Sequence, residues 1–366
     1  MIIMGFPQFY QQGEGLLNNI GELVTVHGRK PLIVADAFVR TTYGEALADS
    51  LKSADIEPVF FPFAGECSPG AIGSAVKHAR DTGCDFVIGF GGGKAIDTAK
   101  AVKIEIGFPV VVVPTIASND SPTSRLAITY EDDGRFIGPR FMTANPEAIL
   151  VDTGIIVQAP VRFFVAGIAD ALVTKFEAEQ CAASGRDNFF SGRPTEAAIC
   201  LAGHCYDVVR KFGVQAVTDV QQKTVTEAVE KVVEANTLLS GLGFEGCGVA
   251  AAHAIGLALG DLESLRGILH GEEVAIGLIA QLVMEGRDTA FVHDILDFYT
   301  AIGLPASLVE AGAENIGESE LRPLAEFIAR PQSRIHNMAM PVSADLVVSS
   351  IMRASEIVAE YRVAKF

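Results

Sequence analysis

Basic residues are scarce in this sequence. It contains 28 Lys and Arg against 45 Asp and Glu, which gives a formal net charge of −17 at pH 7. No basic run offsets this acidic balance, whereas proteins that bind nucleic acid or anionic membranes present basic patches. We therefore expect neither nucleic acid nor a membrane as a partner. An anionic ligand would have to be held by backbone amides and a few local cations.

Cysteine is also sparse, and no two cysteines form a C-x-x-C pair. The six thiols are Cys67, Cys84, Cys181, Cys200, Cys205 and Cys247. Their scattered positions lack the density of a disulfide framework. The composition predicts reduced, mostly buried thiols and a cytoplasmic protein.

No apolar segment runs unbroken to the length of a membrane span. The N-terminal stretch Met1–Tyr10 is apolar, but it has no basic leader and Pro7 interrupts it, so we expect no signal peptide. Internal repeats and low-complexity linkers are absent too. What the chain does contain is material for a core. Of its 366 residues 49% are apolar and only 20% are charged, which suffices for two domains.

The first 160 residues alternate strand-like and helical patterns. Expected strands are Pro31–Asp36, Pro58–Phe63, Asp85–Ile88, Val110–Val113 and Ala148–Asp152, which closes the sheet. Expected helices are Glu45–Ala54, Pro69–Arg80 and a helix from Ala95 onward, and a hairpin is expected from Leu126–Tyr130 and Arg135–Gly138. This alternation predicts a Rossmann-like parallel-sheet α/β domain over residues 1–160. Ligands of such sheets bind at the carboxyl ends of the strands.

The remaining residues, 161–366, are predicted to form an all-α domain. Expected helices are Val161–Ser184, Pro194–Phe212, Val217–Ser240, Val249–Leu259, Glu272–Gly286 and Phe291–Ile302. Convincing strands disappear from this half. We expect ligands in a cleft between the two domains.

The stretch 85–100 joins the clearest strand to a helix through four closely spaced glycines. They are Gly89, Gly91, Gly92 and Gly93. Free amides at a helix N-terminus, beside bare glycine backbone, make an anion cradle suited to a pyrophosphate. The Walker A pattern fails because Ile88 and Ala95 stand where a glycine and a hydroxyl are needed, and G-x-G-x-x-G fails at Lys94. The four glycines can therefore form either an anion-binding site or a purely structural turn.

Three polar residues stand out in the second half. His253 lies in GVAAAHAIGLAL, Asp170 lies in FFVAGIADALVTKF, and His270 stands at the start of a predicted helix. A buried imidazole or carboxylate needs a partner. Two imidazoles and a carboxylate can supply the three protein ligands of a catalytic zinc, with a fourth position open. The other five histidines are expected at the surface or in satisfied core positions, and sequence alone does not show that the three residues meet.

Several motifs occur in one order along nearly the whole chain. They are GECS (65–68), GFGGGKAIDTAKA (89–101), VPTIASNDSPTS (113–124), VDT (151–153), AGIADAL (166–172), EANTLLSGLGFE (234–245), AAAHAIG (250–256), LHGEEVAIG (269–277) and IHNM (335–338). With them the chain resembles the iron-containing alcohol dehydrogenase superfamily, and within it the glycerol dehydrogenases. The GGGK-x-x-D signature of that superfamily explains why both better-known nucleotide motifs fail.

The resemblance implies an NAD-dependent enzyme with a metal ion in the interdomain cleft. Residues implied to be metal ligands, with catalytic and substrate-binding roles, are Asp170, His253 and His270. Asp120 is implied as a further catalytic and substrate-binding residue. Residues implied to bind the cofactor are Asp36, Gly92, Gly93, Lys94, Asp97, Thr115, Ser118, Ser124, Leu126 and Tyr130.

The resemblance also bears on the metal and the substrate. Iron-dependent branches place a histidine four residues after the aspartate, where this chain has Thr174, so Zn²⁺ is expected, with other divalent ions possible. The expected reaction is oxidation of a polyol, glycerol or a related vicinal diol, with hydride transfer to NAD. A vicinal diol can chelate a metal through two oxygens, and the metal lowers the pKa of the hydroxyl.

Some features keep other functions open. Arg125 replaces a small residue, and it either points away from the cofactor, as strand alternation favours, or helps to hold a phosphate or carboxylate. The related 2-hydroxycarboxylate dehydrogenases share most of these motifs, so an NAD(P)-dependent enzyme of that type is the main alternative. Enzymes of the dehydroquinate synthase or glycerol-1-phosphate dehydrogenase type need more cations than Lys175 and Arg266 near the metal motifs. A non-catalytic NAD-binding regulator needs no metal, so the presence of Asp170, His253 and His270 argues against that class.

The family usually forms homo-oligomers, from dimers to larger rings, so a homo-oligomer is expected.

Overall fold

The computed structural model describes residues 1–260, 262–313 and 316–365, which divide into two compact units. The sheet unit holds Gly5–Phe164 and Asp219–Gly241. The helical unit holds Met1–Met4, Val165–Thr218 and Leu242–Phe366. The sequence predicted one boundary, after residue 160. Residues 219–241 lie in the same compact unit as Gly5–Phe164.

Six strands form the main sheet. They are β1 (Tyr10–Gly13), β2 (Pro31–Ala35), β3 (Val59–Pro62), β4 (Phe86–Gly91), β5 (Val110–Pro114) and β8 (Ala148–Asp152). Their order is β1-β8-β5-β4-β2-β3, and every neighbouring pair is parallel. The predicted parallel α/β sheet is confirmed. The expectation that Ala148–Asp152 closes the sheet is wrong, because β1, whose polar sequence YQQG gave no strand signal, lies outside β8.

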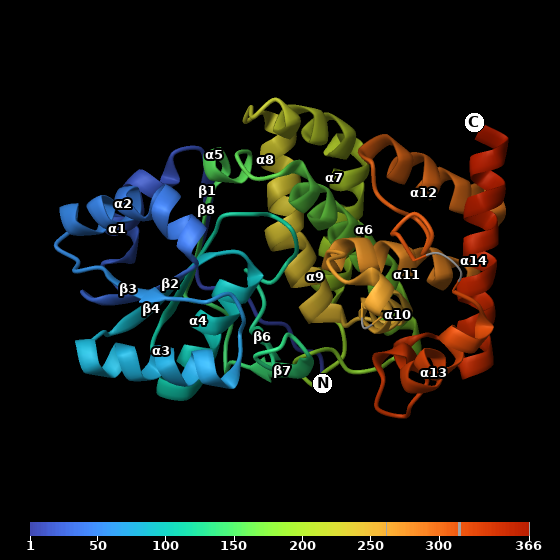
Figure 1. Ribbon diagram of the computed structural model, residues 1–366, viewed down its shortest axis with the longest axis horizontal. Helices are drawn as coiled ribbons and strands as arrows, with labels where there is room; N and C mark the ends of the chain where they lie inside the picture. Colours follow the sequence, from blue (N-terminus) through green and yellow to red (C-terminus); the bar gives the residue numbers. More distant parts are fainter. Residues whose placement is uncertain (261, 314–315, 366) are drawn as a thin grey trace. The chain divides into compact units, whose positions relative to one another are not determined.

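Helices cover both faces of this sheet. They are η1 (Leu16–Asn19), α1 (Ile20–Val24), α2 (Ala37–Ser53), α3 (Pro69–Thr82), α4 (Gly93–Ile106) and α5 (Thr153–Ile156). In Figure 1, α1 and α2 lie on one side of β2 to β4 and α3 lies on the other. Alternate strand residues such as Ile33, Ile88 and Val111 pack with α1 and α2 in one buried core. Helix α2 begins before the predicted start because Asp36 caps it by accepting a hydrogen bond from the amide of Val39.

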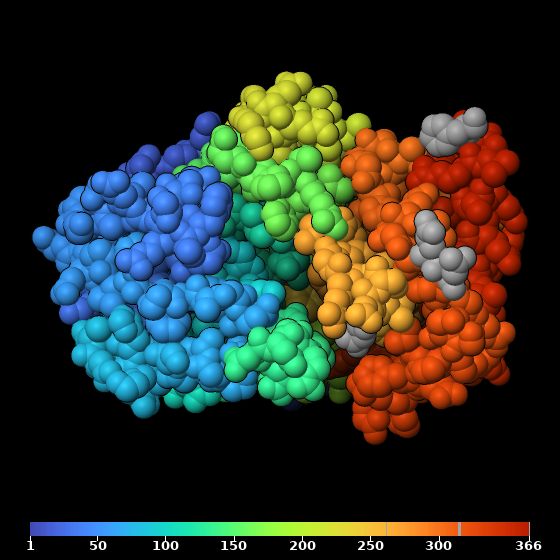
Figure 2. All heavy atoms as spheres, in the orientation of Figure 1, coloured from blue at the N-terminus to red at the C-terminus, as the bar shows by residue number. Residues whose placement is uncertain are grey.

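The predicted hairpin exists, as a separate antiparallel pair. Strands β6 (Leu126–Tyr130) and β7 (Phe136–Phe141) form a two-stranded sheet in which Leu126 faces Phe141. Strand β7 is longer than predicted and mostly exposed. Figure 2 shows this hairpin, in green, at the molecular surface.

Residues 219–241 are tied to the main sheet by polar side chains. This segment contains α8 (Glu227–Glu234) and a π-helical turn, η2 (Ala235–Leu239). Gln12 of β1 donates to the backbone oxygen of Glu230 at 2.8 Å, and Thr153 donates to the Glu230 carboxylate at 2.7 Å. The single helix predicted over 217–240 is wrong, because Thr226 caps the start of α8 and interrupts it.

The helical unit is built from helices of 8 to 26 residues. They are α6 (Val161–Ser184), α7 (Glu196–Gln221), α9 (Ser240–Cys247), α10 (Ala251–Gly260), α11 (His270–Met284), α12 (Thr289–Ile302), α13 (Glu318–Ile328) and α14 (Ala344–Lys365), with short turns η3 (Glu263–Leu265) and η4 (Arg334–Asn337). The all-α character of this half is confirmed. Helices α13 and α14 were not predicted.

The cysteines agree with the expectation of reduced thiols. All six are free, and only Cys200 is exposed. Over the described part of the chain, no single helix has both the length and the apolar composition to cross a membrane, and one bent pair, Glu227–Cys247 with Ala251–Gly260, passes by length and composition only.

Candidate metal and nucleotide sites

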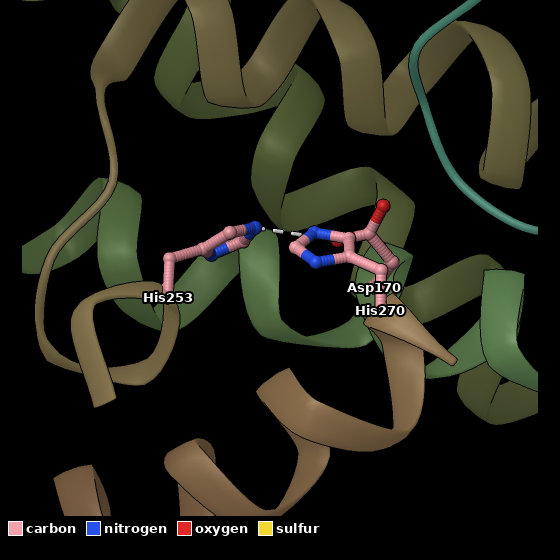
Figure 3. A group of neighbouring side chains, drawn as sticks. All are labelled: Asp170, His253 and His270. Atoms are coloured by element: carbon pink, nitrogen blue, oxygen red, sulfur yellow. Dashed lines mark ion pairs between the residues drawn. The ribbon is translucent and has the colours of Figure 1, made fainter. Parts of the chain in front are cut away.

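Asp170, His253 and His270 come together in the helical unit. Asp170 lies on α6, His253 on the first turn of α10, and His270 is the first residue of α11. Figure 3 shows both imidazole rings turned toward the Asp170 carboxylate. Residues separated by 83 and 100 positions in the sequence thus supply one cluster, and within the described ranges it is the only group of three or more His, Cys, Asp or Glu whose ligand atoms converge.

The distances in this cluster suit a small divalent cation. Nε2 of His253 lies 3.4 Å from Oδ1 of Asp170, and Nε2 of His270 lies 3.7 Å from the same oxygen. Two ligands that each lie about 2.1 Å from a tetrahedral zinc are about 3.4 Å apart. Asp170 is buried, and the His270 side chain keeps 32% of its surface exposed, so the cluster is open on one side. A three-ligand site with one accessible side is typical of catalytic zinc.

A second carboxylate stands behind each imidazole. Nδ1 of His253 lies 2.5 Å from Oε2 of Glu177, and Nδ1 of His270 lies 3.5 Å from Oε2 of Glu273. Both rings therefore present Nε2 to Asp170 and Nδ1 to a glutamate. Metal-binding histidines are commonly held in this way.

These carboxylates also change the acid–base properties of the rings. Burial by itself lowers the pKa of His253, but Glu177 and Asp170 outweigh it and raise the pKa well above its ordinary value. Burial likewise opposes the charged form of His270, while Glu273 and Asp170 raise its pKa overall. The cluster thus attracts positive charge, whether a proton or a metal ion.

Thr174 stands four residues after Asp170, on the next turn of α6. Its hydroxyl donates to the backbone oxygen of Asp170 at 3.2 Å, inside helix α6. Lys175, the cation next to it, pairs with Glu179 and lies over the ring of Tyr206 at 5.5 Å. The described cluster therefore offers three candidate metal ligands, Asp170, His253 and His270.

In the sheet unit, the predicted nucleotide residues gather at one edge of the main sheet. Strands β2, β4 and β5 are adjacent and parallel, so their carboxyl ends share this edge. Asp36 follows β2, Gly92 caps the N-terminus of α4 after β4, and Thr115 follows β5. Thr115 is bound to Gly91 by a 3.0 Å backbone hydrogen bond. The edge thus carries the polar groups that the sequence predicted for a dinucleotide.

At two glycine positions near this turn there is little room for a β-carbon. A β-carbon at Gly89 would lie 3.0 Å from Cα of Ile96 and from Cβ of Ala99, so only glycine lets α4 pack closely on β4. A β-carbon at Gly92 would lie 3.0 Å from Cδ1 of Ile116. The glycines therefore bring the N-terminus of α4 close to the neighbouring loop. This geometry is compatible with an anion-binding site at the helix N-terminus and equally with a purely structural turn.

Lys94 and Asp97 of the GGGK-x-x-D motif have different environments. Lys94 is exposed, pairs with Glu66 and lies 6.0 Å from the ring of Tyr130. Asp97 is buried, and its Oδ2 accepts a hydrogen bond from the amide of Ile128. Burial, partly offset by Lys100, raises the pKa of Asp97 to about 6. Asp97 thus joins α4 to the hairpin.

Buried Lys100 organises the loop that precedes the hairpin. Its ammonium group donates to the backbone oxygen of Leu126 at 2.7 Å, to that of Ser121, and to Oγ of Ser124 at 3.4 Å. Ser124 and Leu126 are buried, whereas Ser118 and Asp120 earlier in the loop are half-buried. Two of the predicted cofactor residues are thus held in place by a lysine that the sequence analysis did not single out.

Arg125 is engaged within the hairpin region. Its guanidinium lies 5.4 Å from the ring of Phe141, and Nη1 donates to the backbone oxygen of Met142 at 3.4 Å. These contacts favour a packing role over recognition of a substrate carboxylate.

Asn236 of the π-helical turn and Ser240, which directly follows it, contact the loop 115–124, and neither was predicted from the sequence as a site residue. Asn236 donates to the backbone oxygen of Ala117 at 3.1 Å, and Ser240 donates to Oδ2 of Asp120 at 2.8 Å. Both belong to the EANTLLSGLGFE motif, so the signal was present without a role attached. π-Helical turns often occur at functional sites.

Comparison with known proteins adds to this geometry. Residues 7–153 match the sequence profile of iron-containing alcohol dehydrogenases. The chain is 41% identical over 350 residues to a glycolaldehyde reductase of Halobacterium salinarum, covering 96% of each chain. It is 40% identical over 350 residues to a glycerol dehydrogenase of Thermotoga maritima, covering 95% of each.

The chain belongs to the iron-containing alcohol dehydrogenase family. Among solved structures of this family, a probable glycerol dehydrogenase from Sinorhizobium meliloti 1021 superposes with a TM-score of 0.93 at 36% identity, covering 98% of this chain and 100% of that one. The resemblance seen in the motifs is thus confirmed. Membership of the family indicates an NAD-dependent alcohol oxidoreductase and implies a metal ion, for which the cluster on α6, α10 and α11 is the candidate site.

Proposed function

We propose that this protein is a glycerol dehydrogenase, which oxidises glycerol to dihydroxyacetone, and related vicinal diols to the corresponding hydroxyketones or hydroxyaldehydes, with NAD. The observation that carries the proposal is the convergence of Asp170, His253 and His270 in a chain of this family. Relatives about equally similar to this chain over nearly its full length act, by their names, on glycerol or on glycolaldehyde. Reduction of glycolaldehyde gives ethane-1,2-diol, so both names point to substrates with oxygens on adjacent carbons.

The metal in this proposal is zinc, held by Oδ1 of Asp170 and Nε2 of His253 and His270. Three ligands of this type, without a histidine at Thr174, suit zinc. When bound, zinc supplies Lewis acidity toward an alcohol hydroxyl, and NAD accepts the hydride. The His270 side chain is partly exposed, so a substrate can reach the cluster from the side of this ring.

The residues at the carboxyl edge of the main sheet would hold NAD. The amides at the start of α4, beside Gly92 and Gly93, suit the pyrophosphate, with Lys94 as the nearby cation. Asp36 would lie at the adenosine end. Thr115, Ser118, Ser124, Leu126 and Tyr130 would flank the nicotinamide, and Asp120 would bind substrate. We further propose a cytoplasmic homo-oligomer, from the reduced thiols and the usual state of the family.

The 2-hydroxycarboxylate alternative is less well supported. A substrate carboxylate calls for a dedicated cation, and the side chain of Arg125 is already directed to Phe141 and Met142.

The test is the initial rate of NADH formation by the zinc-loaded enzyme. Glycerol, propane-1,2-diol, ethane-1,2-diol, propan-1-ol and lactate are compared at equal concentration. We expect glycerol, propane-1,2-diol and ethane-1,2-diol, which carry adjacent hydroxyls, to react well. Propan-1-ol and lactate should react poorly. Turnover of lactate alone would overturn the substrate class, and absence of turnover on all five would overturn the enzymatic proposal.

A further inference from the structure

Glu177 is almost completely buried in the helical unit, with 1% of its surface exposed. It lies on α6 seven residues after Asp170, on the same side of the helix. A buried carboxylate is costly unless hydrogen bonds or positive charge compensate it. Its surroundings show that hydrogen bonds do so here.

Three nitrogen atoms surround the two oxygens of this carboxylate. Oε1 accepts hydrogen bonds from the backbone amides of Ala250 at 2.8 Å and His253 at 2.9 Å. Oε2 lies 2.5 Å from Nδ1 of the His253 ring. A carboxylate offers acceptors only, so Nδ1 must carry a proton for this contact to be a hydrogen bond.

A neutral imidazole carries one proton, so a protonated Nδ1 leaves Nε2 with a free lone pair. Nε2 is the nitrogen that faces Oδ1 of Asp170 (Figure 3). We propose that Glu177 is a positioning residue that fixes the Nδ1–H tautomer of His253 and thereby keeps Nε2 available as a metal ligand. This inference rests on the metal assignment in the proposed function.

Glu177→Gln is the informative substitution, because glutamine keeps the shape but has one acceptor oxygen. If this oxygen serves the two backbone amides, the NH₂ group faces Nδ1, and the ring must carry its proton on Nε2 instead. If the oxygen serves Nδ1, the NH₂ group opposes two buried N–H groups, which is unfavourable. Both orientations weaken the site. We expect the apparent zinc affinity, measured by competition with a chromophoric chelator, to fall about 10- to 100-fold.

Glu273→Gln is the matched control. Glu273 stands behind His270 as Glu177 stands behind His253, but at 3.5 Å and partly accessible to water. Among the described residues no backbone amide donates to its carboxylate, so a glutamine there can turn its oxygen to Nδ1. We expect E273Q to lose clearly less zinc affinity than E177Q, because its glutamine oxygen can still accept the Nδ1 proton. Equal losses in E177Q and E273Q would show that negative charge alone matters and would overturn the tautomer role.

A second control separates the tautomer from helix capping. Gln281 accepts a hydrogen bond from the amide of Ala252 at 2.8 Å, so it also caps the start of α10 without touching the His253 ring. Gln281→Ala should lower the melting temperature while sparing zinc affinity. If the zinc affinities of Q281A and E177Q fall in proportion to the decreases in their melting temperatures, Glu177 only caps the helix and the proposal fails.

The tautomer itself is measurable in the wild-type protein, which covers the case of a variant that does not fold. With ¹⁵N-labelled histidine and His253→Asn for assignment, Nδ1 of His253 should give the chemical shift of a protonated nitrogen with zinc bound. In the metal-free protein, at a pH high enough to remove the second ring proton, Nδ1 should stay protonated while Nε2 gives the shift of an unprotonated nitrogen. An unprotonated Nδ1 would overturn the inference. A wild-type protein that binds no zinc but shows protonated Nδ1 would instead sink the metal assignment and leave the role of Glu177 in the tautomer intact.

Discussion

Ser240 donates a 2.8 Å hydrogen bond to Oδ2 of Asp120, although the two residues are 120 positions apart in the sequence. Ser240 directly follows the π-helical turn Ala235–Leu239, and Asp120 lies in the loop after β5. The same turn accepts a hydrogen bond from Thr123 through the backbone oxygen of Thr237. The π-helical turn therefore fixes the loop that is predicted to bind substrate and nicotinamide.

Ser240→Ala should weaken substrate binding. Loss of one hydrogen bond to a charged group costs about 1.5–3 kcal/mol, so we expect the KM for glycerol to rise about tenfold or more, with zinc affinity unchanged. Ser53→Ala is a suitable control, because it removes a serine hydrogen bond at the end of α2 in the same unit. A KM for S240A equal to that of S53A would show that Asp120 does not need Ser240 or does not bind substrate.

Lys94→Met should weaken NAD binding. Lys94 is an exposed cation in the first turn of α4, where a pyrophosphate would bind, and its charge is shared with Glu66. Removal of a charge-assisted contact predicts about a tenfold rise in the dissociation constant of NAD, measured by fluorescence titration. Glu66→Gln should leave Lys94 available and tighten binding. Unchanged NAD affinity in K94M would exclude Lys94 from the cofactor site.

His253→Ala and Asp97→Ala should separate the two sites. H253A removes a metal ligand, so it should lose zinc and turnover while it keeps NAD affinity. D97A removes the bond between α4 and the amide of Ile128, so it should weaken NAD binding and keep one zinc per chain. Elemental analysis and NAD titration of both variants provide the check. Loss of NAD affinity in H253A would contradict the assignment of the cofactor to the sheet unit.

Zinc binding should strengthen as the pH rises. The pKa values of His253 and His270 are raised, because their neighbouring carboxylates outweigh the opposing effect of burial. In the metal-free protein, the stability gained from protonating them is complete below the unfolded value of about 6.5 and is lost as the pH rises through the raised values. Protons and zinc compete for the same nitrogens. The increase in melting temperature caused by zinc should therefore grow from pH 6 to pH 8, and a constant increase would contradict this competition.

The sequence predicted the main sheet because its central strands are short apolar runs. The prediction from sequence failed for elements whose formation depends on tertiary contacts. The polar strand YQQG at Tyr10–Gly13 pairs with β8 only in the folded sheet, and the break before α8 depends on the Thr226 cap, which also donates to Asp219.

The candidate metal residues were recognisable because Asp170 and His253 interrupt apolar helices. Their convergence was not, since it depends on how three helices pack. Glu177 shows the limit most clearly: it looked like an ordinary glutamate of a long helix, and its partners at the start of α10 are distant in sequence.

The most direct test of the account is metal removal and return. The enzyme is stripped with a chelator, and NADH formation from glycerol is then followed as zinc is added back in known amounts. Zinc bound through Asp170, His253 and His270 predicts negligible turnover in the stripped enzyme and full recovery at one zinc per chain. Undiminished turnover in protein shown by elemental analysis to be free of metal would contradict the central claim.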